Sequence, residues 1–512
     1  RGRPALARLQ VQDVDRRAAT HEAGMPVVGH RLASVPVVEP DVAGQGVEGL
    51  LQQLGGDAHH AGGVVHREAG CPQPRQGFWL DRLEPEQDNF RAAFAWVEER
   101  QDAEIGLRLG AALWRYWASR GHLPEAWRQL ERLLSLPGAQ GRTRARARAL
   151  LGAGTLLHEY SDYHAARPLL EESLSIWREL GEKPGMAIAL NNLSWIATIM
   201  GDADAAESLG AESLALNREL GEKRGIAVAL HNLAWRMLWS GDLEGARRRY
   251  EEAMAVRRES GDRRGLAYMV INLAWLECVQ GNYESAAARL PEAQAVLREL
   301  GDLQIGAWGV QTQARVAYCQ GRIADAHRLL EEARGMWIEA GNQTSLSWTL
   351  AELTHVHLAE GDPDGASLAA EEAFALGSRT GSKAIEAAAR SALGWVAVAR
   401  GDVAEAIRQF RQTEQHGVAA RSVRDLEDAW EGLGAAALLA GDHLEAARAL
   451  GGAAALRERH GLVLPMPERA GHDQRRAAVC GALREAGFAA AWAEGTARAG
   501  ESWAERARST AH

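Results

Sequence analysis

Cysteine is scarce in this chain, and the few cysteines are scattered. Four occur among 512 residues, none in a C-x-x-C spacing, at Cys71, Cys278, Cys319 and Cys480. This distribution excludes a disulfide framework and a zinc site built on paired cysteines. It predicts reduced thiols in a cytoplasmic protein.

Long apolar runs and a strong excess of one charge are also missing. No run approaches the roughly 18–20 residues that a membrane-spanning helix needs, and no basic stretch followed by an apolar one predicts a secretory signal. The formal net charge is −10. We therefore expect a soluble protein that has neither a membrane nor a nucleic acid as its direct partner.

Motifs of nucleotide binding and catalysis are absent as well. The chain has no G-x-x-x-x-G-K-[ST] phosphate-binding loop, because "GSRTGSK" at 377–383 has the wrong spacing. It has no G-x-S-x-G nucleophile motif. Paired glutamates return at regular intervals, which indicates an exposed helix face and not an acid–base pair. We expect a binding protein with no enzymatic activity and no cofactor.

Residues 1–76 differ in composition from the rest of the chain. They are rich in Val, Gly, Pro and His, and only a short patch near "VEGLLQQL" has a helical period. We expect an irregular or disordered segment, or the product of a wrong gene prediction. His59, His60, His66 and Cys71 match no standard metal-ligand spacing and indicate a solvated loop.

What the chain does contain is glycine at regular spacing, in two alternating series with Arg421 as the lone substitute. The series are Gly201, Gly241, Gly281, Gly321, Gly361, Gly401 and Gly441, and Gly181, Gly221, Gly261, Gly301, Gly341, Gly381 and Gly461. The segments between them are dominated by Ala, Leu, Glu and Arg, which are good helix formers. Leu230, Leu233, Ala234 and Met237 lie at i, i+3, i+4 and i+7, which is one face of a helix.

The two glycine series predict two kinds of turn between helices. In the first series, a left-handed Gly closes one helix and a following Asp can cap the next, which predicts a tight helical hairpin. These capping residues are Asp202, Asp242, Asp362, Asp402 and Asp442. The second series opens charged stretches such as "GEKPG" and "GEKRG", for which we expect a looser, solvated turn. Glu219 and Lys223 stand on either side of one such turn, which would allow an ion pair across it.

Two columns of small residues predict where helices pack closely. The columns are Ala206, Ala246, Ala286, Ala326, Ala366, Ala406 and Ala446, and Ser194, Ala234, Ala274, Ala314, Thr354, Gly394 and Gly434. With a Leu before the second column and a bulky residue four positions after the first, the pattern resembles the tetratricopeptide repeat. The period is about 40 residues, against roughly 34 residues for the usual repeat. The resemblance implies an all-α, right-handed solenoid of antiparallel helix hairpins, with about seven strict units over 184–460.

Two flanking stretches resemble a narrower family. "WLDRLEPEQDNFRAAFAWVEER" at 79–100 and "ERAGHDQRRAAVCGALREAGFAAAWAEG" at 468–495 are similar to the segments that open and close the helical region of LuxR-type and SARP-type bacterial transcriptional regulators with a signal-transduction ATPase core. The resemblance implies a sensor role in signal transduction for the repeats. Neither the ATPase nor the DNA-binding domain of such a regulator is evident here, so we expect its sensor part alone.

In tetratricopeptide arrays the first helix of each pair lines the concave groove, so the resemblance places a band of aromatic and amide side chains there. The band comprises Trp195, Trp235, Trp275 and Trp395; Asn191, Asn192, His231, Asn232, Asn272 and Gln311; and Tyr268, Trp308 and Trp348. Amides can bond a peptide backbone and flat rings can cover its apolar side chains, which favours an extended peptide as ligand. Stacked Trp with amide donors also suits a sugar, and packing between successive first helices is the structural alternative.

The sequence thus predicts four segments and a binding function. The segments are 1–76, irregular; 77–140, entry helices; 141–460, the repeat array; and 461–512, capping helices. The expected partner is a protein or peptide, or a small effector, bound by the sensor module of a regulator. The alternative is a free-standing structural adaptor that joins protein subunits and takes no small effector.

Overall fold

The computed structural model describes residues 86–119 and 123–510, and these residues form helices and no strands. The helices are α3 (Gln87–Arg100), α4 (Ala103–Ser119), α5 (Leu123–Leu134), α6 (Arg144–Glu159), α7 (Tyr163–Leu180), α8 (Lys183–Ile199), α9 (Ala203–Leu220), α10 (Lys223–Trp239), α11 (Leu243–Ser260), α12 (Arg263–Val279), α13 (Tyr283–Leu300), α14 (Leu303–Cys319), α15 (Ile323–Ala340), α16 (Gln343–Glu360), α17 (Pro363–Thr380), α18 (Lys383–Arg400), α19 (Val403–Ala419), α20 (Val423–Leu439), α21 (His443–His460), α22 (Met466–Arg498) and α23 (Trp503–Thr510). The predicted irregular segment, with its His and Cys residues, lies outside the described residues.

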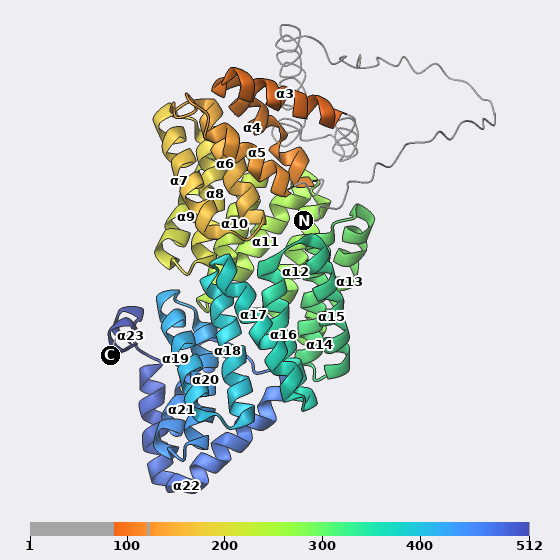
Figure 1. Cartoon of the computed structure of the whole chain (residues 1–512). Coiled ribbons are helices and arrows are strands. Elements are labelled where there is room, and N and C mark those ends of the chain that lie inside the picture. The colour runs from red at the N-terminus through yellow and green to blue at the C-terminus, as the bar shows by residue number, and fades with distance from the viewer. Residues whose placement is uncertain (1–85, 120–122, 511–512) are drawn as a thin grey trace, which may run out of the picture.

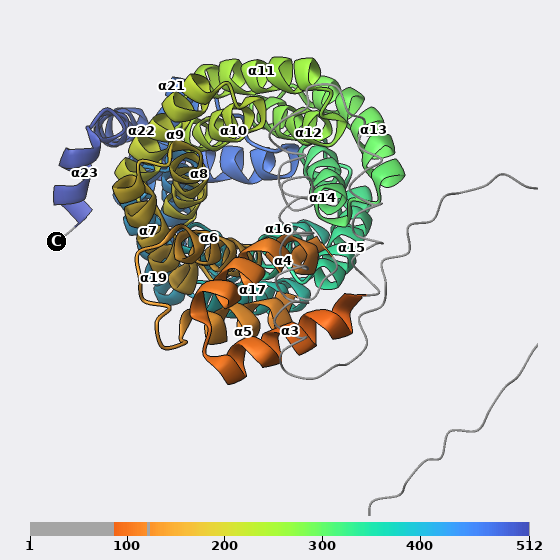
Figure 2. The ribbon, with the colours of Figure 1, turned by 90° about the horizontal axis from the view of Figure 1, so that it is seen from above.

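Consecutive helices pair as hairpins, and the hairpins wind into a superhelix (Figure 1). Seven of them, from α8–α9 to α20–α21, follow each other with the predicted period. Seen from above, α8, α10, α12, α14 and α16 lie nearest the axis, and α9, α11, α13 and α15 form an outer layer (Figure 2). The chain descends as it turns clockwise in this view, so the superhelix is right-handed. The predicted all-α solenoid of helix hairpins is confirmed.

The two columns of small residues lie where the helices of a pair meet. Ala246 is completely buried. The hydroxyl of Ser194 donates a hydrogen bond of 2.8 Å to the carbonyl oxygen of Ala206, across one hairpin. At Gly394 a Cβ atom would lie 2.7 Å from the ring of Phe410. The small residues therefore give the bulky residue of the facing helix its place in the core.

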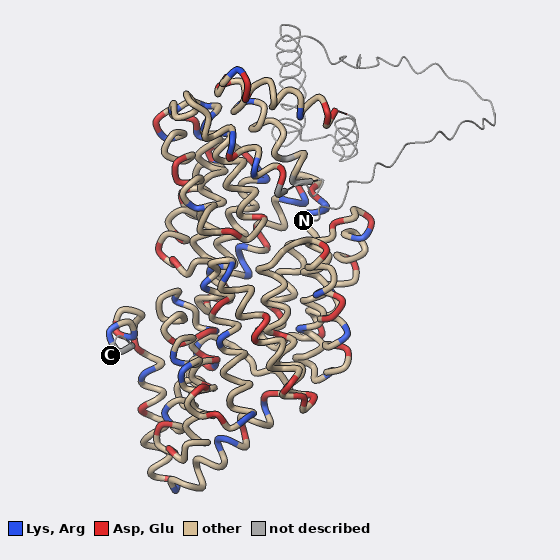
Figure 3. Tube along the Cα trace, viewed as in Figure 1, with Lys and Arg blue, Asp and Glu red and all other residues tan. Residues whose placement is uncertain are grey.

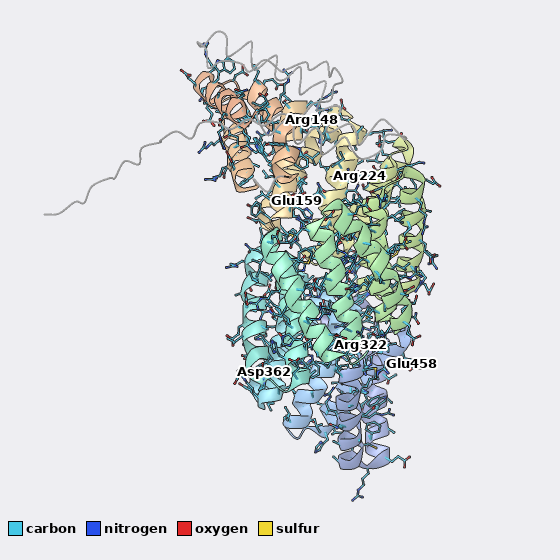
Figure 4. All side chains as sticks on the ribbon, turned by 90° about the vertical axis from the view of Figure 1, so that its right-hand side faces the viewer. Arg148, Glu159, Arg224, Arg322, Asp362 and Glu458 are labelled. Carbon is cyan, nitrogen blue, oxygen red and sulfur yellow. The ribbon has the colours of Figure 1, made fainter. Side chains whose placement is uncertain are left out.

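The turn of the first glycine series has the predicted chemistry. Gly241 has a φ of +81°, and the Oδ1 atom of Asp242 accepts a hydrogen bond of 2.8 Å from the backbone N–H of Gly245. Asp362 caps α17 in the same way (Figure 4). Glycine of the first series thus reverses the chain while Asp begins the next helix. Arg421, the lone substitute for Gly, stands in the second series and adopts the same left-handed conformation, with a φ of +49°.

The prediction of a looser turn at the second glycine series is wrong. Only Gly221 and Glu222 separate α9 from α10. The N–H of Gly221 donates to the carbonyl oxygen of Arg218, and that of Glu222 to Asn217. These two bonds satisfy the last carbonyls of α9 in the Schellman arrangement. The charged residues that follow belong to the first turn of the next helix.

The basic residues after this turn pair with the next repeat and not across the turn. Lys223 lies 3.3 Å from Glu259, Arg263 lies 2.7 Å from Glu299, and Lys183 pairs in the same way with Glu219. All these side chains are about half exposed, so each pair contributes little to stability. Acidic and basic residues are interspersed along the whole array (Figure 3).

Successive turns of the superhelix touch through the short turns between helices. The hydroxyls of Tyr163 and Thr344 lie 3.2 Å apart, and His460 Nδ1 lies 3.2 Å from the carbonyl oxygen of Gly241. These partners are 181 and 219 residues apart. One superhelical turn therefore takes about five repeats.

Substitution by Ala should change the stability of the array in opposite directions at Gly221 and at Gly335. An added Cβ would meet nothing within 4 Å at Gly221, where φ is +68°, or at Gly335 inside α15. We expect Gly221→Ala to destabilise the array by about 1–2 kcal/mol, because Ala resists the left-handed conformation. We expect Gly335→Ala to stabilise it by about 0.5–1 kcal/mol. Thermal unfolding followed by circular dichroism checks both, and a shift of the same sign in both variants would contradict the assigned backbone conformations.

Candidate functional site

Tryptophan side chains of the inner helices meet across the superhelix axis. The ring of Trp235, in α10, lies 5.7 Å from that of Trp308, in α14, and 5.9 Å from that of Trp348, in α16. Trp275, in α12, lies 5.1 Å from Trp308. Because α10 and α16 lie on opposite sides of the axis (Figure 2), these contacts span it. The axial tryptophan cluster, as we call it, consists of Trp195, Trp235, Trp239, Trp275, Trp308 and Trp348.

The cluster has a buried centre and an accessible edge. Trp275 is completely buried, Trp235 is 4% exposed and Trp308 is 8% exposed. Trp195 and Trp348 are only half-buried. The predicted band therefore combines packing between inner helices with rings that a ligand can reach.

Trp395 lies apart from the cluster, further along the superhelix. Its ring packs edge-on against Phe410 at 5.4 Å, and its indole N–H donates a hydrogen bond of 3.0 Å to Asp428. The structure thus brings five of the six predicted tryptophans together and leaves Trp395 with partners of its own.

Two of the predicted asparagines link neighbouring inner helices. Asn192 donates to the hydroxyl of Thr155 at 2.9 Å, and Asn232 donates to the backbone carbonyl of Asn191 at 3.0 Å. Asn272 donates to the carbonyl of Tyr268, one turn earlier in its own helix, at 2.7 Å. The amide nitrogens of Asn192, Asn232 and Asn272 are therefore used within the protein.

Gln311 occupies the same band but is fully engaged within the protein. Its amide nitrogen donates to Glu352 at 2.9 Å. Its amide oxygen accepts from the indole of Trp337 at 3.1 Å and from the hydroxyl of Thr349 at 3.0 Å. This residue joins α14, α15 and α16, and has a structural role.

Several buried polar atoms around the axial tryptophan cluster have no hydrogen-bond partner within the described residues. They are Asn191 Oδ1, Asn272 Oδ1, His231 Nδ1, Trp275 Nε1 and Trp308 Nε1. A buried polar group left unpaired costs about 1–3 kcal/mol, and such groups in native proteins bond a partner or ordered water. Indole donors and amide acceptors in one place match a peptide backbone, which offers both kinds of group.

His231 lies inside this band as a neutral side chain. Its ring stacks on Trp195, with centroids 5.8 Å apart, and its Nε2 lies 3.3 Å from the hydroxyl of Tyr268. Burial, helped by the charge of Arg257, lowers the pKa of His231 to about 3. The imidazole therefore acts as a packing and hydrogen-bonding group near neutral pH.

The depressed pKa makes the array sensitive to mild acid. The unfolded state takes up a proton near the ordinary pKa of 6.5 and the folded state does not, so stability falls as pH falls below that value. From pH 7 to pH 5 this histidine should remove about 2 kcal/mol. We expect His231→Gln to flatten the dependence of the urea midpoint on pH over this range. The control is the same substitution at the exposed His164. If the urea midpoint of His231→Gln depended on pH as steeply as that of the wild type, His231 would not be a neutral, buried imidazole in the folded state.

Two arginines outside the predicted band also lie at the cluster. The guanidinium of Arg424, in α20, lies over the rings of Trp239 and Trp275, at 5.6 and 5.4 Å. That of Arg315, in α14, lies 6.0 Å from the ring of Trp275. Arg315 stands at the Trp position of its repeat, so the repeat pattern places it on the inner face of the array. Arg424 belongs to the following turn of the superhelix, and no local pattern marks it.

Two cavities lie away from the cluster. One of about 410 Å³ opens where the α6–α7 turn meets the α17–α18 turn, with Tyr160, Ser161 and Thr380 in its lining. Another of about 250 Å³ lies between α3 and α5. Neither is lined by a residue of the predicted band.

Over residues 86–119 and 123–510, no group of three His, Cys, Asp or Glu side chains has the geometry to hold a metal ion. None of the helices in these ranges combines the length and the apolar character that a membrane span requires.

Comparison with known proteins identifies the repeats. The tetratricopeptide repeat family matches residues 145–219 and 197–259, and the family of anaphase-promoting complex subunit 5 matches residues 259–307. The chain therefore contains tetratricopeptide repeats, and that predicted resemblance is confirmed. No curated protein matches the sequence. The relation to LuxR-type and SARP-type regulators stays a prediction.

Several solved structures are similar to the chain. A Rap protein complexed with Competence and Sporulation Factor is 12% identical, over 82% of this chain and 98% of that one, with a TM-score of 0.39. Aspartyl phosphate phosphatase F from Bacillus subtilis is 14% identical, over 69% and 95%, with a TM-score of 0.42. Yeast Tom70 is 15% identical, over 81% and 98%, with a TM-score of 0.34.

Proposed function

We propose that the inner face of the array binds an extended peptide segment of a partner protein at the axial tryptophan cluster. The observation that carries this proposal is the coincidence of half-buried Trp rings with buried polar atoms that have no partner within the described residues. A core built only for packing would satisfy or omit such atoms. A peptide supplies amide groups for the polar atoms and apolar side chains for the rings.

We further propose that this module is the effector-sensing part of a bacterial transcriptional regulator. The axial tryptophan cluster joins α10 to α14 and α16 across the axis. A ligand that inserts at its edge would change the separation of these helices and therefore the curvature of the solenoid. In a regulator, a neighbouring domain would respond to that change. Small-angle scattering with and without saturating ligand tests this step, and an unchanged shape would refute it.

Capture of peptides from a lysate of the source organism tests the binding site. The bait is the chain itself, compared with Trp195→Ala/Trp348→Ala, which removes two rings of the accessible edge. The matched control is Ile338→Ala/Leu368→Ala, which removes two exposed apolar side chains, 59% and 71% exposed, from the outer helices α15 and α17. We expect one set of proteins or peptides to be lost only with the Trp variant.

The alternative function is a structural adaptor, and the same capture distinguishes it. Equal retention of the partners by the Trp variant and the wild type would move binding to the outer helices or the ends of the array, as an adaptor requires. Circular dichroism of all three proteins ensures that they are equally folded.

A further inference from the structure

The guanidinium of Arg424 lies at the axial tryptophan cluster. Arg424 makes no hydrogen bond and no ion pair within the described residues. Its side chain is only half-buried and lies over the rings of Trp239 and Trp275. Burial and the nearby charge of Arg315 lower the pKa of Arg424, but an arginine stays protonated at neutral pH. A positive charge with five free N–H donors is therefore held in place beside aromatic rings.

Arg315 places a second guanidinium on the same ring. It lies 6.0 Å from the centroid of Trp275, and its side chain is 17% exposed. Its nearest carboxylate is that of Glu352, at 4.0 Å, which is too long for a hydrogen bond. Glu352 instead accepts from Gln311 through Oε2. Glu352 and Glu468 thus offset part of this charge without occupying the donors of either arginine.

The other carboxylates near Arg424 are committed elsewhere. Asp428 accepts from the indole of Trp395 and from the hydroxyl of Ser391. Asp425 lies 3.4 Å from His416. Both lower the net positive potential at the site, but neither reaches the guanidinium of Arg424.

We infer that Arg315 and Arg424 form a binding site for a carboxylate of the ligand, at the Trp275 end of the axial tryptophan cluster. The inference rests on the proposed function, since it names the group of the peptide that is recognised there. Two guanidiniums on one ring offer several N–H donors to one anion, and a carboxylate accepts from two at once. The buried indole N–H of Trp275, which has no acceptor within the described residues, belongs to the ring that both guanidiniums approach.

The position of Arg424 links ligand binding to the shape of the superhelix. Trp239 and Trp275 belong to α10 and α12, whereas Arg424 belongs to α20, in the following turn of the superhelix. Near this point Arg236 also donates to the carbonyl oxygen of Arg421, 185 residues away. A carboxylate that bonds both Arg315 and Arg424 therefore ties α14 to α20, which meets the preceding turn of the superhelix at Trp239 and Trp275, and binding is coupled to the pitch of the superhelix.

Three pools of synthetic decapeptides test the inference with the full chain. The first pool has free carboxyl termini and no Asp or Glu, the second has amidated termini and contains Asp and Glu, and the third has amidated termini and neither acid. Peptides that remain with the protein after gel filtration are identified by mass spectrometry, and their Kd values are measured. We expect the first or the second pool to be retained and the third to be lost. Which of the two is retained shows whether the carboxylate is terminal or belongs to a side chain.

Variants of the arginines complete the test. We expect Arg424→Gln and Arg315→Gln to weaken binding of the retained peptide by about 10-fold or more, and Arg424→Lys to weaken it less because the charge is kept. The control is Arg408→Gln, an exposed arginine of α19 that pairs with Glu405. If Arg424→Gln does not fold, the affinity of the wild type is measured against salt concentration instead, and an affinity that does not fall with salt overturns the inference.

The outcomes separate the inference from the proposed function. If the wild type retains the third pool and Trp195→Ala/Trp348→Ala does not, the proposed peptide site is supported and the carboxylate-binding role of the two arginines is refuted. Wild-type affinity in Arg424→Gln would do the same. Retention of no pool would overturn both.

Discussion

Replacing Trp275 by Ala is expected to unfold the middle of the array, whereas replacing Trp348 is expected to leave it folded. Trp275 is completely buried and touches Trp308, Trp348 and the guanidiniums of Arg315 and Arg424. Truncation of a buried Trp leaves a cavity and costs about 3–5 kcal/mol. In a repeat array this cost falls on the repeats that share the contact.

Hydrogen exchange measured by mass spectrometry shows which helices lose stability. In Trp275→Ala we expect faster exchange in α10, α12, α14 and α16, with α6–α7 and α21 unchanged. Trp348→Ala should lose peptide binding with little change in exchange, because its ring is only half-buried. If hydrogen exchange in Trp275→Ala matched that of the wild type, the centre of the axial tryptophan cluster would not be part of the core. The distinction between a buried centre and an accessible edge would then be wrong.

Local features of this fold could be predicted from the sequence because they depend on residues close together in the chain. Gly241 and Asp242 form their turn with atoms three residues away, and the spacing of small residues depends on the pitch of a single helix. Ala246, Ala286 and the rest of their column are therefore buried as expected. The turn at Gly221 was mispredicted, since charged residues there suggested solvated loop where they begin a helix.

The shape of the superhelix could not be predicted in the same way. It is the sum of small rotations between repeats, none of which has a residue pattern of its own. The Trp rings were assigned to one face, but the contact between Trp235 and Trp348, which belong to different repeats, depends on how tightly that face closes on itself. Arg424 reaches the cluster only because about five repeats complete a turn. The basic residues such as Lys223 were expected to pair across the turn, but their partners lie in the adjacent repeat.

A buried carboxylate joins the first part of α22 to the array. Glu431, in α20, is 3% exposed and lies 3.0 Å from Arg457, 2.9 Å from His472 and 2.8 Å from Arg475. Arg457 belongs to α21, and the other two belong to α22. Burial disfavours the carboxylate, but the hydrogen bond to His472 and the charges of Arg457 and Arg475 outweigh it and lower the pKa of Glu431 to about 2.

Removal of this negative charge is expected to loosen the first part of α22. Glu431→Gln keeps the shape of the side chain but leaves buried basic groups without their counter-charge, which costs about 3–5 kcal/mol. We expect limited proteolysis to cut within or before α22 in the variant at protease concentrations that leave the wild type intact. The matched control is Glu494→Gln, which breaks an ion pair between α22 and Arg448 whose carboxylate is 58% exposed, and which should have little effect.

Acid provides an independent check, because the same charge can be removed by protonation. The folded pKa of Glu431 lies below its ordinary value of 4.5, so its contribution is complete above about pH 4.5 and is lost as pH falls towards 2. In the wild type, hydrogen exchange in α22, corrected for its intrinsic dependence on pH, should accelerate over this window relative to α12. In Glu431→Gln it should be fast throughout and show no such transition. An identical acid transition in both proteins would mean that another group holds α22 in place, because Gln cannot lose a charge that it does not carry.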